Sequence, residues 1–267
     1  MRTLIALSLV AALSGCAIST QQEVEMGAGY AAELNRQLPL VQDAELNRYM
    51  NVLGDSIARI ADTRNLDWSF YIVDSPDVNA FAVPGGFIYM NRGLIERATN
   101  LAQVAGVLGH EIGHVTQRHS VEQMQKAQRT NVGVVGLCIF LPNLCASQAG
   151  SAAIQLGAGA AMASFSRADE DEADAVAIDY MVRAGIDPNG VPEMFQILLE
   201  ERQRKPEGLD TWFRSHPLEE DRVAAGKRRV AQYPPDQLIG LTRDTPSFQN
   251  FQKRLKALPP SPAAPRQ

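Results

Sequence analysis

The sequence predicts an α+β fold that is mainly α-helical, and two observations support this class. Apolar residues recur at helical spacing across residues 20–63 and again from residue 92 onward. Strand signals are confined to the stretch between these regions, where Trp68, Phe70 and Ile72 occupy alternate positions of residues 68–74 and residues 79–90 contain two apolar runs. We therefore expect a small β-sheet or hairpin packed beside a larger set of helices.

The helices follow one by one from their apolar spacing. The predicted helices cover residues 20–37, 44–63, 92–98, 100–120 with a possible continuation to Arg129, 169–184, 192–202, 218–233 and 246–255. The helix at 169–184 is followed by Gly185 and then Pro188, a common stop signal. Residues 258–267, LPPSPAAPRQ, are expected to form a disordered tail.

Residues 79–90, NAFAVPGGFIYM, carry turn chemistry at their centre. Pro84 fixes its own φ angle, and Gly85 and Gly86 permit backbone conformations that other residues rarely adopt. A hairpin or a bent strand is therefore expected here.

The helix that begins at residue 100 carries the chemistry of the chain. Asn100 can cap its first turn. His110 and His114 are four residues apart and project from nearly the same face, so two imidazole nitrogens can converge on one metal ion. Glu111 lies about 100° round the helix, where it can hold a water beside the metal. In this HExxH pattern zinc lowers the pKa of the water to about 7 and the carboxylate accepts its proton.

Two glycines in the same helix predict close packing. Gly109 and Gly113 each precede a motif histidine. Gly inside a helix lowers the stability of the helix by roughly 1 kcal/mol relative to Ala, so its presence indicates that another element must approach closely. We therefore expect a neighbouring element to pack against this part of the helix.

A catalytic zinc site needs a third protein ligand and an open position for water. The longer pattern in which a third histidine follows is excluded, because Gln117 and Ser120 occupy the positions that need Gly and His. His119 is rotated by about 140° from His114 on a helix, which favours a surface position. The third ligand is therefore expected from a distant part of the chain.

An acidic cluster at residues 165–177, FSRADEDEADAVA, can supply this ligand. Glu170 and Asp174 are four residues apart and share one helix face, so one can bind zinc while the other accepts a hydrogen bond from a ligand histidine. The helix dipole explains the presence of some of the other acidic residues, which are Asp169, Asp171 and Glu172.

Four stretches, in their order and spacing, resemble metallopeptidase family forty-eight, the gluzincins that include HtpX, the CAAX prenyl protease, BepA and LoiP. The stretches are NAFAVPGGFIYM, GHEIGH, SRADEDEAD and SHPLEEDR. The resemblance implies a gluzincin-like zincin core, with residues 16–257 as a single zinc metallopeptidase domain. Because long spanning helices and a helical-repeat domain are absent from the sequence, we expect the small periplasmic lipoprotein branch.

The resemblance also implies roles for individual residues. His110, His114 and Glu170 are expected to bind one Zn²⁺, with Glu111 as the base and Asp174 supporting a ligand histidine. The expected function is a zinc endopeptidase acting on unfolded or misassembled envelope proteins, with envelope assembly or protease proteins as further partners. One alternative is a zinc-stabilised, chaperone-like binding lipoprotein with little turnover. Another is a structural zinc protein, which needs a closed site with four ligands.

His216 is the remaining histidine to which a function can be given, although it can also be a simple loop residue before Pro217. The family resemblance includes an HP pair with an Arg six residues after the His, and Arg222 matches that spacing. An imidazole here can donate to the oxyanion formed during hydrolysis. It can instead occupy the open zinc position and hold the protease inactive.

Residues 1–15 are predicted to be a lipoprotein signal peptide, because an apolar run ends in LSGC. The alternative is a plain signal peptide with an incidental cysteine. Lipid on Cys16 would anchor the protein, and Ala17 favours the outer membrane by resemblance to known lipoproteins, so the expected location is the periplasm. In that oxidising compartment, a disulfide between Cys138 and Cys145 is expected.

Two further expectations concern partners. Residues 131–164 are rich in Gly and Ala, and their densest apolar run is too short for a membrane span, so we expect an apolar hairpin or lid over the active cleft. The net charge of −5 and the lack of a basic cluster argue against nucleic acid as a partner.

Overall fold

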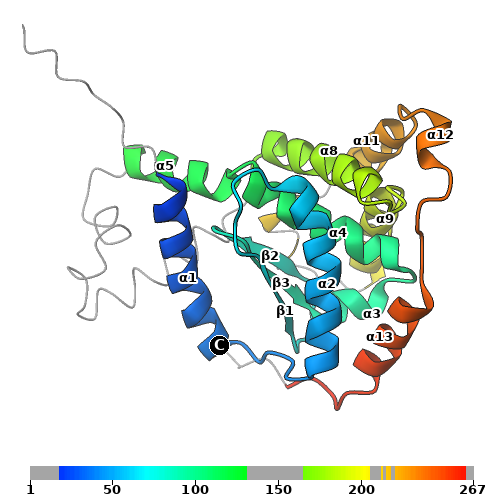
Figure 1. The fold of residues 1–267 in the computed structure, drawn as a ribbon, viewed down its shortest axis with the longest axis horizontal. Coiled ribbons are helices and arrows are strands. Elements are labelled where there is room, and N and C mark those ends of the chain that lie inside the picture. The colour runs from blue at the N-terminus through cyan, green and yellow to red at the C-terminus, as the bar shows by residue number, and fades with distance from the viewer. Residues whose placement is uncertain (1–17, 131–164, 205–211, 213–214, 218–219, 263–267) are drawn as a thin grey trace, which may run out of the picture.

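The computed structural model describes residues 18–130, 165–204, 212, 215–217 and 220–262, which form helices around one small sheet (Figure 1). The helices are α1 Thr20–Gln37, α2 Ala44–Ala61, α3 Arg92–Arg97, α4 Leu101–Thr116, α5 His119–Thr130, α8 Arg167–Arg183, α9 Gly190–Arg204, α11 Glu220–Val230, α12 Pro235–Leu238 and α13 Pro246–Lys256. The strands are β1 Ser69–Val73, β2 Ala80–Val83 and β3 Phe87–Asn91. The predicted mainly helical α+β class is confirmed.

The predicted hairpin is confirmed, and it supplies the central strand and one edge strand of the sheet. Strands β2 and β3 pair antiparallel, β1 joins β3 in parallel, and the sheet order is β1-β3-β2. The turn between β2 and β3 places Gly85 at φ 87° and Gly86 at φ 102°, a region that favours glycine. Strand β2 therefore lies at one edge of the sheet.

The two faces of the sheet are covered by different helices. Ile88 and Met90 of β3 point into the main core with residues of α2 and α4. Tyr89, between them, points the other way into a smaller apolar cluster with Tyr30 and Leu34 of α1. Figure 1 accordingly shows the sheet between α1 on one side and α2 and α4 on the other.

Helix α4 is buried along nearly its whole length and packs closely against α8. Asn100 caps it by accepting a hydrogen bond from the backbone amide of Gln103. A Cβ atom on Gly113 would lie 2.9 Å from Val176 Cγ2 and 3.2 Å from the Ala173 carbonyl oxygen, which is tighter than an ordinary contact. The predicted close approach is therefore confirmed at Gly113, and it brings the motif histidines against the acidic helix.

One predicted helix is interrupted. Helix α4 ends at Thr116 instead of continuing to Arg129, and α5 begins at His119. Between them Arg118 adopts φ 62°, a left-handed conformation that ends helical hydrogen bonding. The direction of the chain, and of the side chains that follow, changes at this residue.

The tail expected to be disordered from residue 258 is held to the body over its first residues. Arg92 donates hydrogen bonds to the carbonyl oxygens of Leu258, at 3.2 Å, and Pro259, at 2.7 Å. Ser261 Oγ donates to Asp74 at 2.7 Å. These bonds supply the order that the Pro-rich composition did not predict.

Several predictions concern segments outside the described residues. They are the signal peptide with Cys16, the Gly/Ala-rich residues 131–164 with Cys138 and Cys145, and the last residues of the tail. Within the described ranges, no helix combines the length and the apolar character needed to cross a membrane.

Candidate metal site

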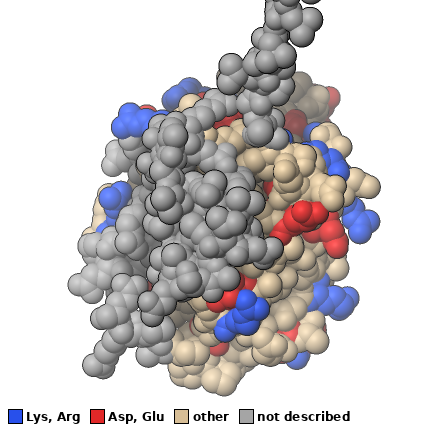
Figure 2. Space-filling model, turned by 90° about the vertical axis from the view of Figure 1, so that its left-hand side faces the viewer, with Lys and Arg blue, Asp and Glu red and all other residues tan. Residues whose placement is uncertain are grey.

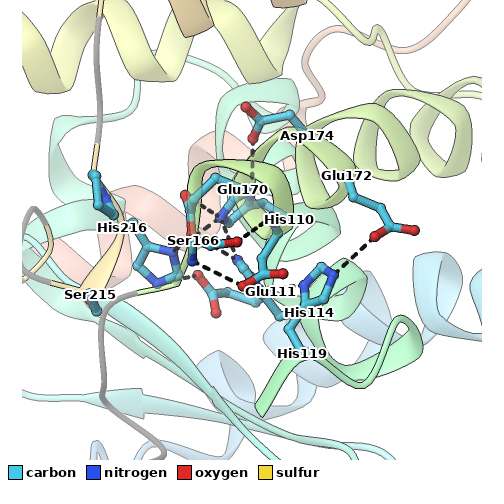
Figure 3. A network of polar contacts seen from close by, with 12 residues as sticks. His110, Glu111, His114, His119, Ser166, Glu170, Glu172, Asp174, Ser215 and His216 are labelled. Carbon is cyan, nitrogen blue, oxygen red and sulfur yellow. Dashed lines mark hydrogen bonds and ion pairs between the residues drawn. The ribbon is translucent and has the colours of Figure 1, made fainter. Parts of the chain in front are cut away.

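Four buried side chains converge at the junction of α4, α8 and the segment that precedes α11 (Figure 3). His110 and His114 come from α4, Glu170 from the first turns of α8, and His216 from the segment before α11. Each is at most 1% exposed, and the atoms that could bind a metal all lie within 4.8 Å of one another. The structure thus brings the three predicted ligands together and adds His216.

The spacing of these atoms fits a tetrahedral metal ion. His110 Nε2 lies 3.0 Å from His114 Nε2 and 3.2 Å from His216 Nδ1. Glu170 Oε1 lies 3.0 Å from His216 Nδ1 and 3.3 Å from His114 Nε2. Ligand atoms at the corners of a tetrahedron around an ion bound at about 2.0–2.1 Å are separated by about 3.3–3.4 Å. The chemistry and spacing of the donors both suit such an ion, with His216 in the fourth position.

Glu111 lies beside this cluster and has an unusual environment. Its side chain is fully buried, and neither carboxylate oxygen accepts a hydrogen bond within the part of the chain that the structure describes. His216 Nε2 is 3.5 Å from its Oε1. Burial raises the pKa of Glu111 above its usual value, so the carboxylate is a stronger base than an exposed glutamate.

The protonation of two ligands is also set by the surroundings. Burial lowers the pKa of His114 well below its usual value, so the ring is neutral and a lone pair is available for a metal. Burial alone would raise the pKa of Glu170, but the charge of His216 and its hydrogen bond to the carboxylate hold that pKa well below its usual range. Glu170 is therefore ionised.

Asp174 and Arg222 support the ligands from behind. Asp174 Oδ1 lies 2.9 Å from His110 Nδ1, which places the carboxylate where the sequence analysis expected it. Arg222 donates to both oxygens of Asp174, at 2.8 and 2.9 Å, and its Nη1 lies 2.6 Å from Glu170 Oε2. One guanidinium thus links the carboxylate behind His110 to the carboxylate in the metal cluster.

Two residues have positions that the sequence analysis did not expect. His119 was expected on the surface but is only 3% exposed, because the left-handed Arg118 redirects the chain before it. Its Nδ1 lies 2.9 Å from His114 Nδ1. Glu172, interpreted as a helix-dipole residue, has Oε2 at 3.3 Å from His119 Nε2 (Figure 3). No Gly or Pro stands between Thr116 and His119 to signal the break.

Comparison with known proteins agrees with this geometry. The sequence pattern of peptidase family M48 matches residues 42–230. The beta-barrel assembly-enhancing protease of Escherichia coli (strain K12) is 34% identical over 232 residues, which cover 83% of this chain and 46% of that protein. The protein of the same name from Yersinia pestis is 34% identical over 230 residues, with the same shares. Metalloprotease LoiP of E. coli (strain K12) is 30% identical over 195 residues, covering 70% of this chain and 69% of LoiP.

The chain spans about half the length of the beta-barrel assembly-enhancing proteases that it matches. The matched region nevertheless contains the four clustered side chains, Glu111 beside them, and Asp174 and Arg222. The chain therefore belongs to peptidase family M48.

Proposed function

We propose that the protein is a zinc endopeptidase in which His110, His114 and Glu170 bind the metal and Glu111 is the base. The observation that carries this proposal is the state of Glu111, a fully buried carboxylate without a hydrogen bond from the described residues. Burying a carboxylate without hydrogen bonds lowers the stability of a fold, so such a group is more often found where it takes part in a reaction.

The mechanism follows from the positions of these side chains. Zinc, when bound, would polarise a peptide carbonyl and make a water more acidic. Glu111 then accepts a proton from the water as it attacks the carbonyl, and passes the proton to the leaving nitrogen. Asp174 and Arg222 hold His110 and Glu170 in place, so the ligands do not rearrange during the reaction.

We propose that extended backbone segments of substrate proteins pair with strand β2. This strand is at the edge of the sheet and packs beside α4, which carries the motif histidines. Pairing through backbone hydrogen bonds depends little on side chains, so recognition would tolerate many sequences. A site of this kind suits unfolded proteins, whose backbone is accessible.

We further propose that the substrates are unfolded or misassembled envelope proteins. Support comes from the names of two relatives, a beta-barrel assembly-enhancing protease and a metalloprotease. The LSGC sequence ending at Cys16 supports a lipoprotein of the periplasm, anchored in the outer membrane. Other envelope assembly or protease proteins are candidate partners in this role.

The proposal can be separated from a zinc-stabilised binding lipoprotein by cleavage of one protein in two states. We expect the wild-type chain to cut a denatured outer-membrane protein and to leave its folded form intact. Removing the metal with a chelator should stop cleavage, and adding zinc should restore it. Binding of the denatured protein without cleavage under all these conditions would favour the chaperone-like alternative.

A further inference from the structure

The two motif histidines are supported in different ways on the side away from the metal cluster. His110 Nδ1 faces a carboxylate directly, with Asp174 Oδ1 at 2.9 Å. His114 Nδ1 faces another imidazole, with His119 Nδ1 at 2.9 Å, and His119 Nε2 in turn lies 3.3 Å from Glu172 Oε2. Each motif histidine is therefore linked to a carboxylate from α8. His110 contacts its carboxylate directly, whereas the ring of His119 lies between His114 and Glu172.

We propose that His119 and Glu172 form a positioning pair that fixes the ring orientation and the tautomer of His114 for the metal. The inference rests on metal binding at the proposed site, but it does not require peptide hydrolysis.

The contacts determine which ring nitrogen carries the proton in His114 and in His119, starting from the side that faces the metal. A metal needs the lone pair of His114 Nε2, the atom that faces His110 and Glu170, so the proton of the neutral ring is on Nδ1. His114 Nδ1 then donates, and His119 Nδ1 must accept. The proton of a neutral His119 is therefore on Nε2, where it points at Glu172. This assignment gives one donor and one acceptor both to the contact between His114 and His119 and to the contact between His119 and Glu172.

The fold holds His119 in place through the residue before it. Arg118 Nε donates to Glu23 at 2.9 Å, and Arg118 Nη2 donates to the Ile18 carbonyl oxygen at 2.6 Å. Glu23 is a fully buried residue of α1 and also accepts from Arg64 at 2.8 Å. These bonds stabilise the left-handed conformation that turns His119 inward. On an unbroken helix His119 would point about 140° away from His114.

The two members of the pair differ in exposure, which predicts different effects. His119 is 3% exposed, so its loss leaves the Nδ1–H of His114 without an acceptor in a buried place. The side chain of Glu172 is 56% exposed, so water can replace much of its contact. His119 is therefore expected to contribute more to metal binding than Glu172.

The test is the zinc dissociation constant, measured by competition with a chelator on variants whose metal-free forms are checked by thermal unfolding. In His119→Leu we expect zinc affinity to fall about 10 to 100-fold, the usual effect of losing a group behind a ligand. In His119→Asn the amide oxygen takes the position of Nδ1, so much of the affinity should return. Glu172→Gln should have a smaller effect than His119→Leu. Asp171→Asn, on the same helix, is the matched control and should bind zinc like the wild type.

The visible spectrum of the Co²⁺-loaded protein provides a second readout. It should change in His119→Leu and return toward the wild type in His119→Asn, because the orientation of the His114 ring affects the ligand field. If His119 contributed to stability alone, its substitution would change thermal unfolding but leave the zinc affinity and the Co²⁺ spectrum unchanged, which would overturn the positioning pair.

If His119→Leu does not fold, the comparison of His119→Asn with His119→Gln still tests whether His119 positions His114. Asn must bind zinc more tightly than Gln, because only Asn offers an oxygen at the Nδ1 position. Equal affinities, or the reverse order, would overturn the positioning pair while leaving the proposed function intact. A wild-type chain that binds no zinc would overturn both.

Discussion

His216 lies among the proposed metal ligands and beside the proposed base. Its Nδ1 is 3.2 Å from His110 Nε2 and 3.0 Å from Glu170 Oε1, and its Nε2 is 3.5 Å from Glu111 Oε1. The imidazole therefore contacts two of the proposed ligands and the base at once. Of the two roles considered for it, occupation of the open metal position agrees better with this geometry than donation to an oxyanion.

We accordingly expect His216→Ala to raise peptidase activity while one zinc per chain is retained, because three ligands remain and the fourth position becomes accessible. The measurement is kcat and KM on a denatured protein, with metal content determined on the same sample. A kcat lowered by about 10²–10³ with zinc retained would instead assign His216 to the oxyanion. Unchanged kinetics would reject both roles.

Substitutions of the acidic residues of α8 should lower the zinc affinity by different amounts, according to the position of each residue. Glu170→Ala is expected to lose the most zinc affinity, because it removes a ligand. Asp174→Ala should lose about 10 to 100-fold, because it removes only the group behind His110. Asp171→Ala should have no effect, since Asp171 is exposed and pairs with Arg229 on the surface. Chelator competition measures all three, and equal affinities would contradict the assignment of the acidic helix.

The residues of the site were predictable to different degrees. The spacing of His110 and His114 on a helix fixes their shared direction and puts Glu111 about 100° round the helix, so sequence alone was sufficient. Glu170 needed the family resemblance, because Asp174 has an equally suitable helical position. His119 could not be predicted, since its direction depends on the φ angle of Arg118, and a distant residue, Glu23, holds that side chain.

At the scale of elements, α1 must approach the β2–β3 turn closely. A Cβ atom on Gly27 would lie 1.8 Å from the Pro84 carbonyl oxygen, whereas one on Gly29 would meet nothing within 4 Å. The two glycines are in the same helix, two residues apart; Gly27 is buried against the turn, whereas Gly29 is exposed. They form a natural matched pair for testing how α1 packs.

We expect Gly27→Ala to lower the free energy of unfolding by about 1–3 kcal/mol, because the methyl group forces α1 away from the turn. Gly29→Ala should raise it by up to about 1 kcal/mol through helix propensity alone. Denaturant unfolding of both variants checks the pair. Two stabilised variants would show that α1 does not pack on the turn as described.

The elements were predictable where a periodic pattern was long. The apolar periodicity of α2 and the turn residues of the hairpin were sufficient to predict their type, because these signals are local. The four-residue α12 escaped prediction because it is too short to show a period. The sequence did not predict that Leu258 and Pro259 are ordered, because their order depends on hydrogen bonds from Arg92, which is remote in sequence.

At the scale of the whole molecule, the proposed lipid anchor and the proposed metal ligands are different residues that lie far apart in the sequence. Cys16 lies outside the described residues, whereas the metal cluster is buried between α4 and α8. On the side shown in Figure 2, basic and acidic side chains are interspersed over the described surface. The proposal that membrane attachment depends on a lipid rests on the LSGC sequence that ends at Cys16.

Cys16→Ser should release the protein from the membrane fraction and leave peptidase activity toward a denatured protein unchanged. Fractionation of cell envelopes, followed by an activity measurement on the released protein, checks both parts. If the variant stays in the membrane fraction, the lipid is not the only attachment, and residues 131–164 become the next segment to test.

In the proposed mechanism Glu111 converts a metal site into a hydrolytic one, and the Glu111→Gln variant examines this role without disturbing the ligands. The substitution keeps the size of the side chain and all three ligands but removes the base. Peptidase activity and zinc content should be measured on the same preparation. We expect about one zinc per chain and no detectable cleavage of a denatured protein. Cleavage at the wild-type rate with zinc bound would contradict this mechanism.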